Sequence, residues 1–282
     1  MSGELARLPI VYEPTVTGLP PLRPYLADLW ERRRFIWHLA RTDLKAEHYN
    51  TVLGQVWVVI DPLFLAAVYF LLRSVVRPAA TGADRNLVIA HLIWAVFFFM
   101  YTNNVVMAGA RSLVKGGGLI LNASFPRAAL PLVAVIKAAC DFAPTLAVYF
   151  VFQVVLGQPI TPALLFVPLI VVILTVFNTG VALLVAPVTV FYRDTANVIP
   201  YVTRIWMYLT PVLFTISEIP VGLRAYLRWN PLYPFYAALE QIFTGSVPSL
   251  GSLAAATAWA VVAFLSGAVV FLSREREFAV RL

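Results

Sequence analysis

Long stretches without a charged side chain are the feature of this 282-residue chain that most constrains its fold. No Asp, Glu, Lys or Arg lies between Arg85 and Arg111, between Asp141 and Arg193 (51 residues), or between Glu240 and Arg274. One membrane-spanning helix needs only about 20 predominantly apolar residues. In addition, 61% of the residues are apolar and 12% are charged, against roughly 45–50% and 25% in soluble domains. The chain is therefore predicted to be an integral membrane protein.

Apolar runs and the breaks between them predict an all-α fold with six transmembrane helices. The spans run from about Leu53 to Leu72, Leu87 to Gly109, Ala128 to Leu156, Ala163 to Val190, Val198 to Ile216, and Leu250 to Ser273. The first long apolar run begins near Val52, after a charged stretch, so we do not expect a cleaved secretory signal.

The distribution of Lys and Arg predicts the orientation. With the N-terminus inside, the cytoplasmic segments hold 14 of these residues and the external segments hold 5; Lys137 and Arg204 lie within spans, which accounts for all 21. Positive charge concentrates in cytoplasmic segments of membrane proteins. We expect a multi-pass protein of the plasma (inner) membrane with both termini in the cytoplasm. The net charge of +7 requires no nucleic acid partner.

Composition divides the chain into four parts. Residues 1–22 form an N-terminal tail, 23–52 a cytoplasmic interface helix, 53–273 the transmembrane domain, and 274–282 a cytoplasmic C-terminal tail. Within the transmembrane domain, 110–127 and 191–197 are cytoplasmic loops, and 217–249 is an external, re-entrant segment rich in proline and aromatic residues. Aromatic residues favour the membrane interface. We predict two short external gate helices there, Val221–Trp229 and Phe235–Thr244, that dip into the outer leaflet; an ordinary extracellular loop is the alternative.

The segment before the first span is amphipathic. Apolar residues recur at near-helical spacing, and cations lie between them; the apolar set is Leu22, Leu26, Leu29, Ile36, Ala40 and Leu44, and the main cations are Arg32, Arg33, Arg34, Arg41 and Lys45. Such a helix lies on the inner membrane surface with its cations among anionic head groups. The alternative is that these cations only set the topology.

No catalytic or cofactor site is predicted in this chain. The histidines, His38, His48 and His91, are scattered and form no metal-ligand pattern, and Cys140 is a lone cysteine for which we expect a packing role. The stretch Lys115-Gly116-Gly117-Gly118 has its lysine before the glycines, so it cannot act as a phosphate-binding loop. If the protein uses ATP and Mg²⁺, another chain must bind them.

Besides Arg204, three charged residues lie within predicted spans, where each is costly. Lys137 and Asp141 are four residues apart, so they can neutralise one another on one helix face. Asp61 precedes Pro62 in the first span. It either faces an aqueous path or accepts hydrogen bonds from a neighbouring helix.

Aromatic residues fall on common helix faces in two spans. Trp94, Phe98 and Tyr101 are spaced i, i+4, i+7, and Tyr201 and Tyr208 are also seven apart. Aromatic rings present an apolar face and, for Tyr and Trp, a polar tip, which suits contacts with sugars. These rings either line a glycan path or pack against lipid or a neighbouring helix.

Several segments, in this order, resemble one family. They are Asp43-Leu44-Lys45 followed by Thr51-Val52-Leu53-Gly54-Gln55-Val56-Trp57 and Pro62, the stretch from Gly118 to Arg127 with Leu130-Pro131, Tyr192-Arg193-Asp194, and Asn230-Pro231-Leu232. The chain resembles, over roughly residues 25 to 275, the transmembrane subunits of ABC-2 type polysaccharide exporters, known as Wzm-type permeases. It departs from their pattern at Glu47-His48, where a basic and then an aromatic residue are common.

This resemblance implies a homodimeric permease with two copies of a separate nucleotide-binding subunit that hydrolyses ATP. The substrate would be a polyprenyl-diphosphate-linked polysaccharide of the O-antigen, teichoic acid or galactan type. Arginine outnumbers lysine 18 to 3, which favours a GC-rich genome and a galactan exporter of the actinobacterial, mycobacterial type. The implied contacts with the ATPase are Leu119, Asn122, Phe125, Pro126, Arg127, Arg193 and Asp194; the cations of the interface helix would form the substrate entrance.

Other classes of protein remain as alternatives. An ABC-2 exporter of drugs or lipids would share the fold. A secondary transporter is less favoured because no repeated halves are evident. An integral membrane enzyme would need clustered acids or histidines on one membrane face, which the sequence lacks.

Overall fold

The computed structural model describes residues 21–47, 54–76 and 83–281, and in these residues all regular secondary structure is helical. The α-helices are α1 (Leu22–Glu31), α2 (Arg33–Glu47), α3 (Trp57–Val76), α4 (Ala83–Lys115), α5 (Gly117–Asn122), α6 (Ala129–Val155), α7 (Val167–Phe191), α8 (Thr195–Leu209), α9 (Val221–Leu227), α10 (Tyr233–Phe243), α11 (Leu250–Arg274) and α12 (Phe278–Arg281). Residues 1–20 of the predicted N-terminal tail, His48, and the Thr51 to Leu53 part of the first motif lie outside the described residues.

Five segments are long and apolar enough to cross a membrane. They are Trp57–Val75, Arg85–Lys115, Ala129–Val155, Pro162–Phe191 and Leu250–Glu277. They correspond to the first four predicted spans and the last. The prediction of a multi-pass α-helical membrane protein is confirmed.

The fifth predicted span, Val198 to Ile216, is only partly helical. α8 ends at Leu209, and Thr210 is extended, with φ −98° and ψ 147°. Pro211 explains this end, because a proline disfavours the α conformation of the residue before it. The 15 residues of α8 span about 22 Å at 1.5 Å per residue, which is short of a hydrocarbon core of about 30 Å. A sixth crossing therefore stays a prediction.

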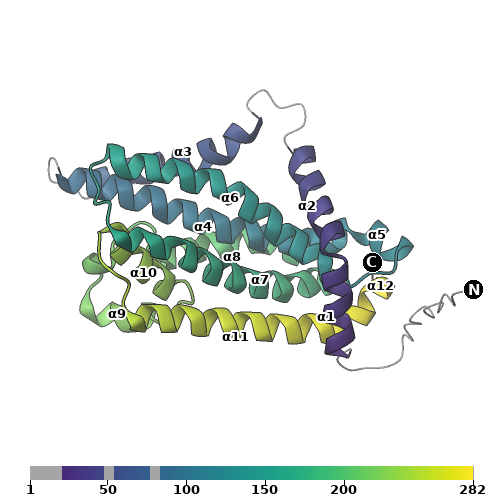
Figure 1. Cartoon of the computed structure of the whole chain (residues 1–282). Helices are drawn as coiled ribbons and strands as arrows, with labels where there is room; N and C mark the ends of the chain where they lie inside the picture. The colour runs from purple at the N-terminus through teal and green to yellow at the C-terminus, as the bar shows by residue number, and fades with distance from the viewer. Residues whose placement is uncertain (1–20, 48–53, 77–82, 282) are drawn as a thin grey trace, which may run out of the picture.

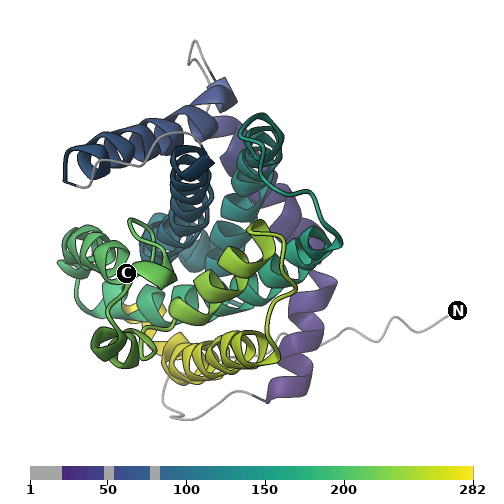
Figure 2. The ribbon, with the colours of Figure 1, turned by 90° about the vertical axis from the view of Figure 1, so that its left-hand side faces the viewer.

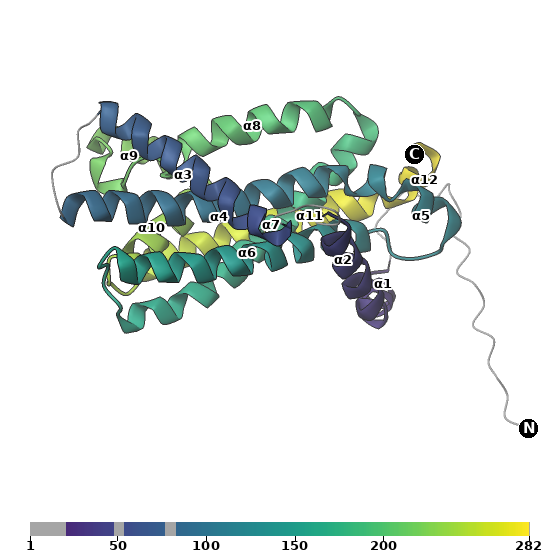
Figure 3. The same cartoon turned by 90° about the horizontal axis from the view of Figure 1, so that it is seen from above.

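The spanning helices lie side by side, and the short helices gather at the two ends of the bundle (Figure 1). α1 and α2 run across one end, next to α5, α12 and the C-terminus, and α9 and α10 lie at the other. Figure 2 looks along the helices from that second end. From above, α8 forms one margin of the bundle, with α6 toward the other (Figure 3).

α7 and α11 form the most extensive helix pair, and glycines allow their close approach. A Cβ atom at Gly180 would meet the backbone of Ala263 and Phe264, and one at Gly267 would meet the backbone of Gly180. Small residues at such contacts let helix backbones approach in membranes, where van der Waals packing replaces the hydrophobic effect as the driving force. The pair places Phe191 and Arg274, at the ends of α7 and α11, at the same end of the bundle.

The segment predicted to be external, 217–249, contains two short helices, but they differ in burial. In α10, Phe235, Tyr236 and Phe243 are at most 3% exposed, and the Tyr236 hydroxyl donates to the Ala95 carbonyl of α4 at 2.8 Å. Near α9, in contrast, Tyr226 and Trp229 lie on the surface. α10 is therefore packed into the helical bundle.

We predict that Gly267→Ala destabilises the protein, because the added methyl group forces α7 and α11 apart. Overpacking of this kind costs about 1–3 kcal/mol, more than the roughly 1 kcal/mol that alanine gains in helix propensity. The measurement is thermal unfolding of the purified chain in detergent. Gly251→Ala, on the same helix with nothing near its added Cβ, is the control and should not lower the Tm. Equal Tm values for the two variants would contradict the packing argument.

Candidate functional site

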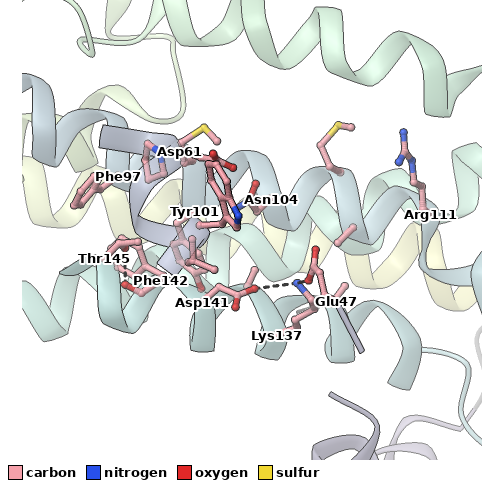
Figure 4. A pocket seen from close by; sticks show the side chains of 18 residues that line it. Glu47, Asp61, Phe97, Tyr101, Asn104, Arg111, Lys137, Asp141, Phe142 and Thr145 are labelled. Carbon is pink, nitrogen blue, oxygen red and sulfur yellow. Dashed lines mark hydrogen bonds and ion pairs between the residues drawn. The ribbon is translucent and has the colours of Figure 1, made fainter. Parts of the chain in front are cut away.

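A polar cavity of about 520 Å³ lies between α3, α4 and α6, at membrane depth (Figure 4). Its polar lining comes from four helices: Glu47 of α2, Asp61 of α3, Tyr101, Asn104 and Arg111 of α4, and Lys137, Asp141 and Thr145 of α6. Its size falls within the range of about 300–1,000 Å³ that is usual for ligand pockets. This cavity is the main candidate site of the membrane domain.

The charges around the cavity are partly neutralised. Lys137 Nζ lies 2.9 Å from Asp141 Oδ2, which confirms the predicted pair, and Lys137 also pairs with Glu47. Within the part of the chain that the structure describes, Asp61 and Arg111 form no ion pair. Figure 4 places Arg111 at one end of the cavity, away from the Lys137 cluster. The lining thus offers charged and hydroxyl or amide groups to a polar ligand.

Asp61 is exposed to the cavity, in line with the aqueous alternative of the two predicted for it. A hydrogen bond to a neighbouring helix, the other alternative, is absent from the described residues. Its neighbour Pro62, which is buried, lines the same cavity.

Two ion pairs tie α2 to the membrane helices at the cavity. Asp43 Oδ2 accepts a hydrogen bond from Lys115 Nζ, at the end of α4, at 3.0 Å. Glu47 pairs with Lys137 of α6. These contacts explain why Asp43 stands in the first motif. They also give a role to Glu47, where the chain departs from the family pattern.

The predicted aromatic path is wrong for Trp94 and Phe98 of α4. Trp94 and Phe98 are at most 2% exposed, and their rings pack against those of Phe243, 5.4 Å from Trp94, and Phe142, 5.0 Å from Phe98. Tyr101 is also buried, with its hydroxyl 2.8 Å from Thr175 Oγ1, although its side chain lines the cavity. Helical spacing places these side chains on one face, and this face packs into the protein core.

Tyr201 and Tyr208, on α8, have a different environment. Tyr201 is 66% exposed and Tyr208 is 49% exposed. They are available to lipid, to a second copy of the chain or to a substrate.

The basic segment before the first span forms two helices, α1 and α2, with a break at Arg32, where the sequence predicts one helix. Part of its apolar stripe packs on protein: Ile36 and Ala40 are buried against Ala129 and Val133 of α6. Arg32 pairs with Asp28 at 2.7 Å. The other predicted cations, Arg33, Arg34, Arg41 and Lys45, are exposed.

The predicted cytoplasmic segment between α4 and α6 contains α5 and exposes an apolar side chain that the sequence patterns did not indicate. Leu121 is 61% exposed. Phe125, the predicted docking side chain, is instead half-buried, with its ring 5.9 Å from that of Phe35 on α2. Of the other predicted contacts, Asn122 is exposed, Leu119 is half-buried and Pro126 is buried.

Glu275 joins three parts of the chain at this end of the bundle. Its Oε1 accepts hydrogen bonds from the Tyr25 hydroxyl at 3.0 Å and from the Arg127 backbone N–H at 2.7 Å. The Arg127 guanidinium donates to the Glu275 carbonyl, and the Ala128 N–H donates to the Tyr25 hydroxyl at 3.3 Å. Because Tyr25 and Glu275 are at most 9% exposed, these bonds are shielded from water. We call Tyr25, Arg127 and Glu275 the carboxylate clamp.

The other predicted coupling residues lie on the surface. Arg193 and Asp194 are exposed between α7 and α8, and Tyr192 is 71% exposed. The Asp194 carbonyl accepts from the Val198 N–H at 3.2 Å, so this motif begins α8.

At the other end of the bundle, Asn230 connects the external segment to α8. Its Oδ1 accepts from Trp206 Nε1 at 2.9 Å and from the Leu232 N–H at 3.0 Å, and its Nδ2 donates to the Leu209 carbonyl at 2.9 Å and to Thr210 Oγ1 at 3.0 Å. These bonds satisfy polar groups where α8 ends. They explain the Asn230-Pro231-Leu232 motif.

Arg73, at the end of α3, holds the same external segment through Glu218. Its Nη1 donates to Glu218 Oε2 at 3.0 Å, and Nη2 donates to Oε1 at 2.5 Å. Burial alone would raise the pKa of the Glu218 carboxyl, but hydrogen bonds from Arg73 and Thr215 outweigh it and hold the pKa below its usual value. Burial raises the pKa of Glu240, which accepts from the Ile216 N–H.

The family of the chain follows from its similarity to known proteins. A family model described as "ABC-2 type transporter" matches residues 35–244, which is more than half of the 282 residues. The chain belongs to the ABC-2 type transporter family. The family predicted from the motifs is thereby confirmed.

Two relatives of this ABC-2 family chain are named as permeases of O-antigen export. It is 27% identical to an O-antigen export system permease protein of Myxococcus xanthus over 256 residues, which cover 89% of this chain and 96% of the relative. It is also 27% identical to an O-antigen export system permease protein of Klebsiella pneumoniae over 209 residues, 73% of this chain and 78% of that relative.

Sequence reasoning missed several residues of this ABC-2 family chain that the structure brings to the site. Asn104 and Arg111 lie seven residues apart on one face of α4, so polar residues at helical spacing within an apolar run were an available signal. Glu275 is one of two acids, with Glu277, among the arginines after the last span. Leu121 had no such signal, because the sequence cannot show which apolar side chain of a loop stays uncovered.

We predict that Tyr25→Phe loosens α1 from the rest of the helical bundle, because it removes the hydroxyl group that donates to Glu275 in the carboxylate clamp. Losing a buried hydrogen bond to a carboxylate costs about 1.5–3 kcal/mol. Hydrogen exchange in residues 22–31 should become faster. Tyr226→Phe, which removes the hydroxyl of a tyrosine that is 76% exposed, should leave exchange there unchanged. Unchanged exchange in the Tyr25 variant would show that the clamp does not hold α1.

Proposed function

We propose that the chain is the transmembrane subunit of an ATP-driven exporter that moves a polyprenyl-diphosphate-linked polysaccharide out of the cytoplasm. The polar cavity at membrane depth carries this proposal, because hydroxyl-rich and anionic groups are costly in hydrocarbon and need a protein-lined path. The relatives named O-antigen export permeases support a polysaccharide as the substrate. Among such glycans we favour a galactan, on the arginine-rich composition.

The proposed glycan path uses Asp61, Asn104 and Tyr101 of the cavity, together with the exposed Tyr201 and Tyr208. Asp61 and Asn104 offer hydrogen bonds to sugar hydroxyl groups, and tyrosine rings stack on the apolar faces of sugars. The buried Trp94 and Phe98 have no part in it.

The proposed transporter contains two copies of this chain in the inner membrane, each with six spans and cytoplasmic termini. α8 and the residues that follow it would make the fifth crossing. The exposed cations Arg33, Arg34, Arg41 and Lys45 would attract the diphosphate to the cytoplasmic entrance, because a cationic surface concentrates anionic lipids.

We propose that α5 and the exposed motif at Arg193 and Asp194 contact a separate ATPase, one copy for each permease, which binds ATP and Mg²⁺. Leu121 is the apolar side chain best placed to enter a socket on this partner, since partly exposed apolar anchors that become buried dominate protein interfaces. Phe125 supports α5 through Phe35. The carboxylate clamp passes movement of this segment to α1 and α11.

Leu121→Asp should abolish co-purification of the ATPase, because it would bury an unpaired charge in the socket. The matched control is Leu250→Asp, at the other end of the bundle and 85% exposed, which should retain the ATPase. Both variants should be recovered from the membrane in normal amount. If Leu121→Asp retains the ATPase and Phe125→Asp loses it, Phe125 is the anchor instead.

Depletion of the chain should cause a lipid-linked glycan to accumulate in the cytoplasmic leaflet, and re-expression of the wild type should clear it. We expect Tyr201→Ala with Tyr208→Ala to restore export only partly, with a several-fold lower rate, since each stacked ring contributes about 0.5–1.5 kcal/mol. Radiolabelled sugar in lipid extracts gives the measurement. Phe264→Ala, a partly exposed ring on α11, serves as the control. Depletion without glycan accumulation would contradict polysaccharide export and favour a drug or lipid exporter.

A further inference from the structure

A second pocket, apart from the proposed glycan path, lies where α7 and α11 end beside α12. It has a volume of about 340 Å³. Its walls are Pro187 and Val188 of α7 and Val270 of α11, and its rim holds Phe191, Arg274 and Arg281. The pocket is therefore apolar on the side of the bundle and cationic at its end.

Two guanidinium groups converge on one aromatic ring at this rim. The Cζ of Arg281 lies 4.8 Å from the centroid of the Phe191 ring, and that of Arg274 lies 5.6 Å from it. Phe278 of α12 is fully buried, and its ring lies 6.4 Å from that of Phe191 and 5.2 Å from that of Phe271. Phe278 thus anchors α12, and this anchor brings Arg281 over Phe191.

These arginines have little competing negative charge. Arg274 Nη1 lies 3.1 Å from Glu277 Oε1, but both side chains are at least 40% exposed, and such surface pairs are weak. In the described residues Arg281 forms no ion pair. The rim therefore keeps a positive charge that an anion can approach.

The apolar walls point to an occupant that reaches into the membrane. Val188 and Val270 are 41% and 37% exposed, and both lie within segments of spanning length. A cytoplasmic protein could contact the arginines but not these walls. An amphiphile with an anionic head and acyl chains fits both parts.

We propose that this pocket binds an anionic phospholipid of the cytoplasmic leaflet. The phosphodiester lies between Arg274 and Arg281, and one acyl chain lies along the groove between α7 and α11. Basic pockets between membrane helices on the cytoplasmic side bind anionic lipid head groups by this chemistry. The site is next to the carboxylate clamp, since Glu275 directly follows Arg274. It requires the predicted orientation but not a polysaccharide substrate.

Native mass spectrometry of the full-length chain, delipidated in detergent, tests the proposal. Dioleoyl-phosphatidylglycerol should bind at least about tenfold more tightly than dioleoyl-phosphatidylcholine, because two arginines act on its charge. Arg274→Gln with Arg281→Gln should abolish this preference. Arg23→Gln with Arg228→Gln removes the same charge at two exposed positions and should retain it. Equal binding of the two lipids by the wild type would overturn the proposal.

Two further variants separate the head group from the acyl chain. Val188→Trp fills the apolar wall without changing charge, so it should weaken the binding of phosphatidylglycerol several-fold; unchanged binding would overturn the proposed chain position. Arg274→Lys with Arg281→Lys should keep part of the preference, since the charge remains without the planar fork. Inorganic phosphate should not compete, and full competition would show a simple anion site. Loss of the ATPase in the Gln variant with unchanged lipid binding would assign the rim to the ATPase and refute the lipid.

Discussion

The cost of a charge in hydrocarbon is the constraint on which the rest of this structure depends. Because of this cost, the spanning segments carry few charged residues. Those in the interior of these segments lie beside an oppositely charged partner or a polar cavity. Lys137 is held by Asp141 and Glu47 beside the cavity, and Arg73 is neutralised by Glu218 where α3 ends. The pairs of Lys137 with Glu47 and of Arg73 with Glu218 also connect separate elements of the chain. Lys137 and Arg73 therefore hold separate parts of the membrane domain together through their ion pairs.

Contacts at the end of the bundle that holds α1, α2, α5 and α12 join segments that are distant in sequence (Figure 1). Asp43 and Glu47 tie α2 to α4 and α6, and the carboxylate clamp ties α1 to the segment before α6 and to the end of α11. Phe125 adds an aromatic contact between that segment and α2. Under the proposed function, a displacement of α5 by an ATPase would therefore move the basic surface of α1 and α2, at the proposed substrate entrance, together with the last span.

Sequence patterns predicted what depends on local composition. The apolar runs located five spanning segments, and the spacing of Lys137 and Asp141 gave their pairing. The patterns did not predict the burial of a side chain where it depends on which helix packs over that side chain. Trp94 and Phe98 share a helix face, as spacing requires, but α10 covers that face and makes it core. Phe125 was expected to contact the ATPase, yet it is half-buried against Phe35 of α2. The early end of α8 was readable from Pro211, because its effect on the backbone of Thr210 is local.

The distribution of charge separates the surfaces that would bind the diphosphate and the glycan of the proposed substrate. Around the cavity three carboxylates face two cations, and Lys137 is already engaged by two of the acids. An anionic diphosphate would gain little there, whereas neutral sugar hydroxyl groups can bond to both acids and amides. Unlike Arg111, other exposed cations lie away from the cavity, including those on α2 and at the ends of α11 and α12. Under the proposed function, the diphosphate stays at the basic membrane surface while the glycan enters the cavity. Anionic phospholipids would then compete with the diphosphate for the surface cations, and a separate pocket at Phe191 would hold one such lipid away from the path.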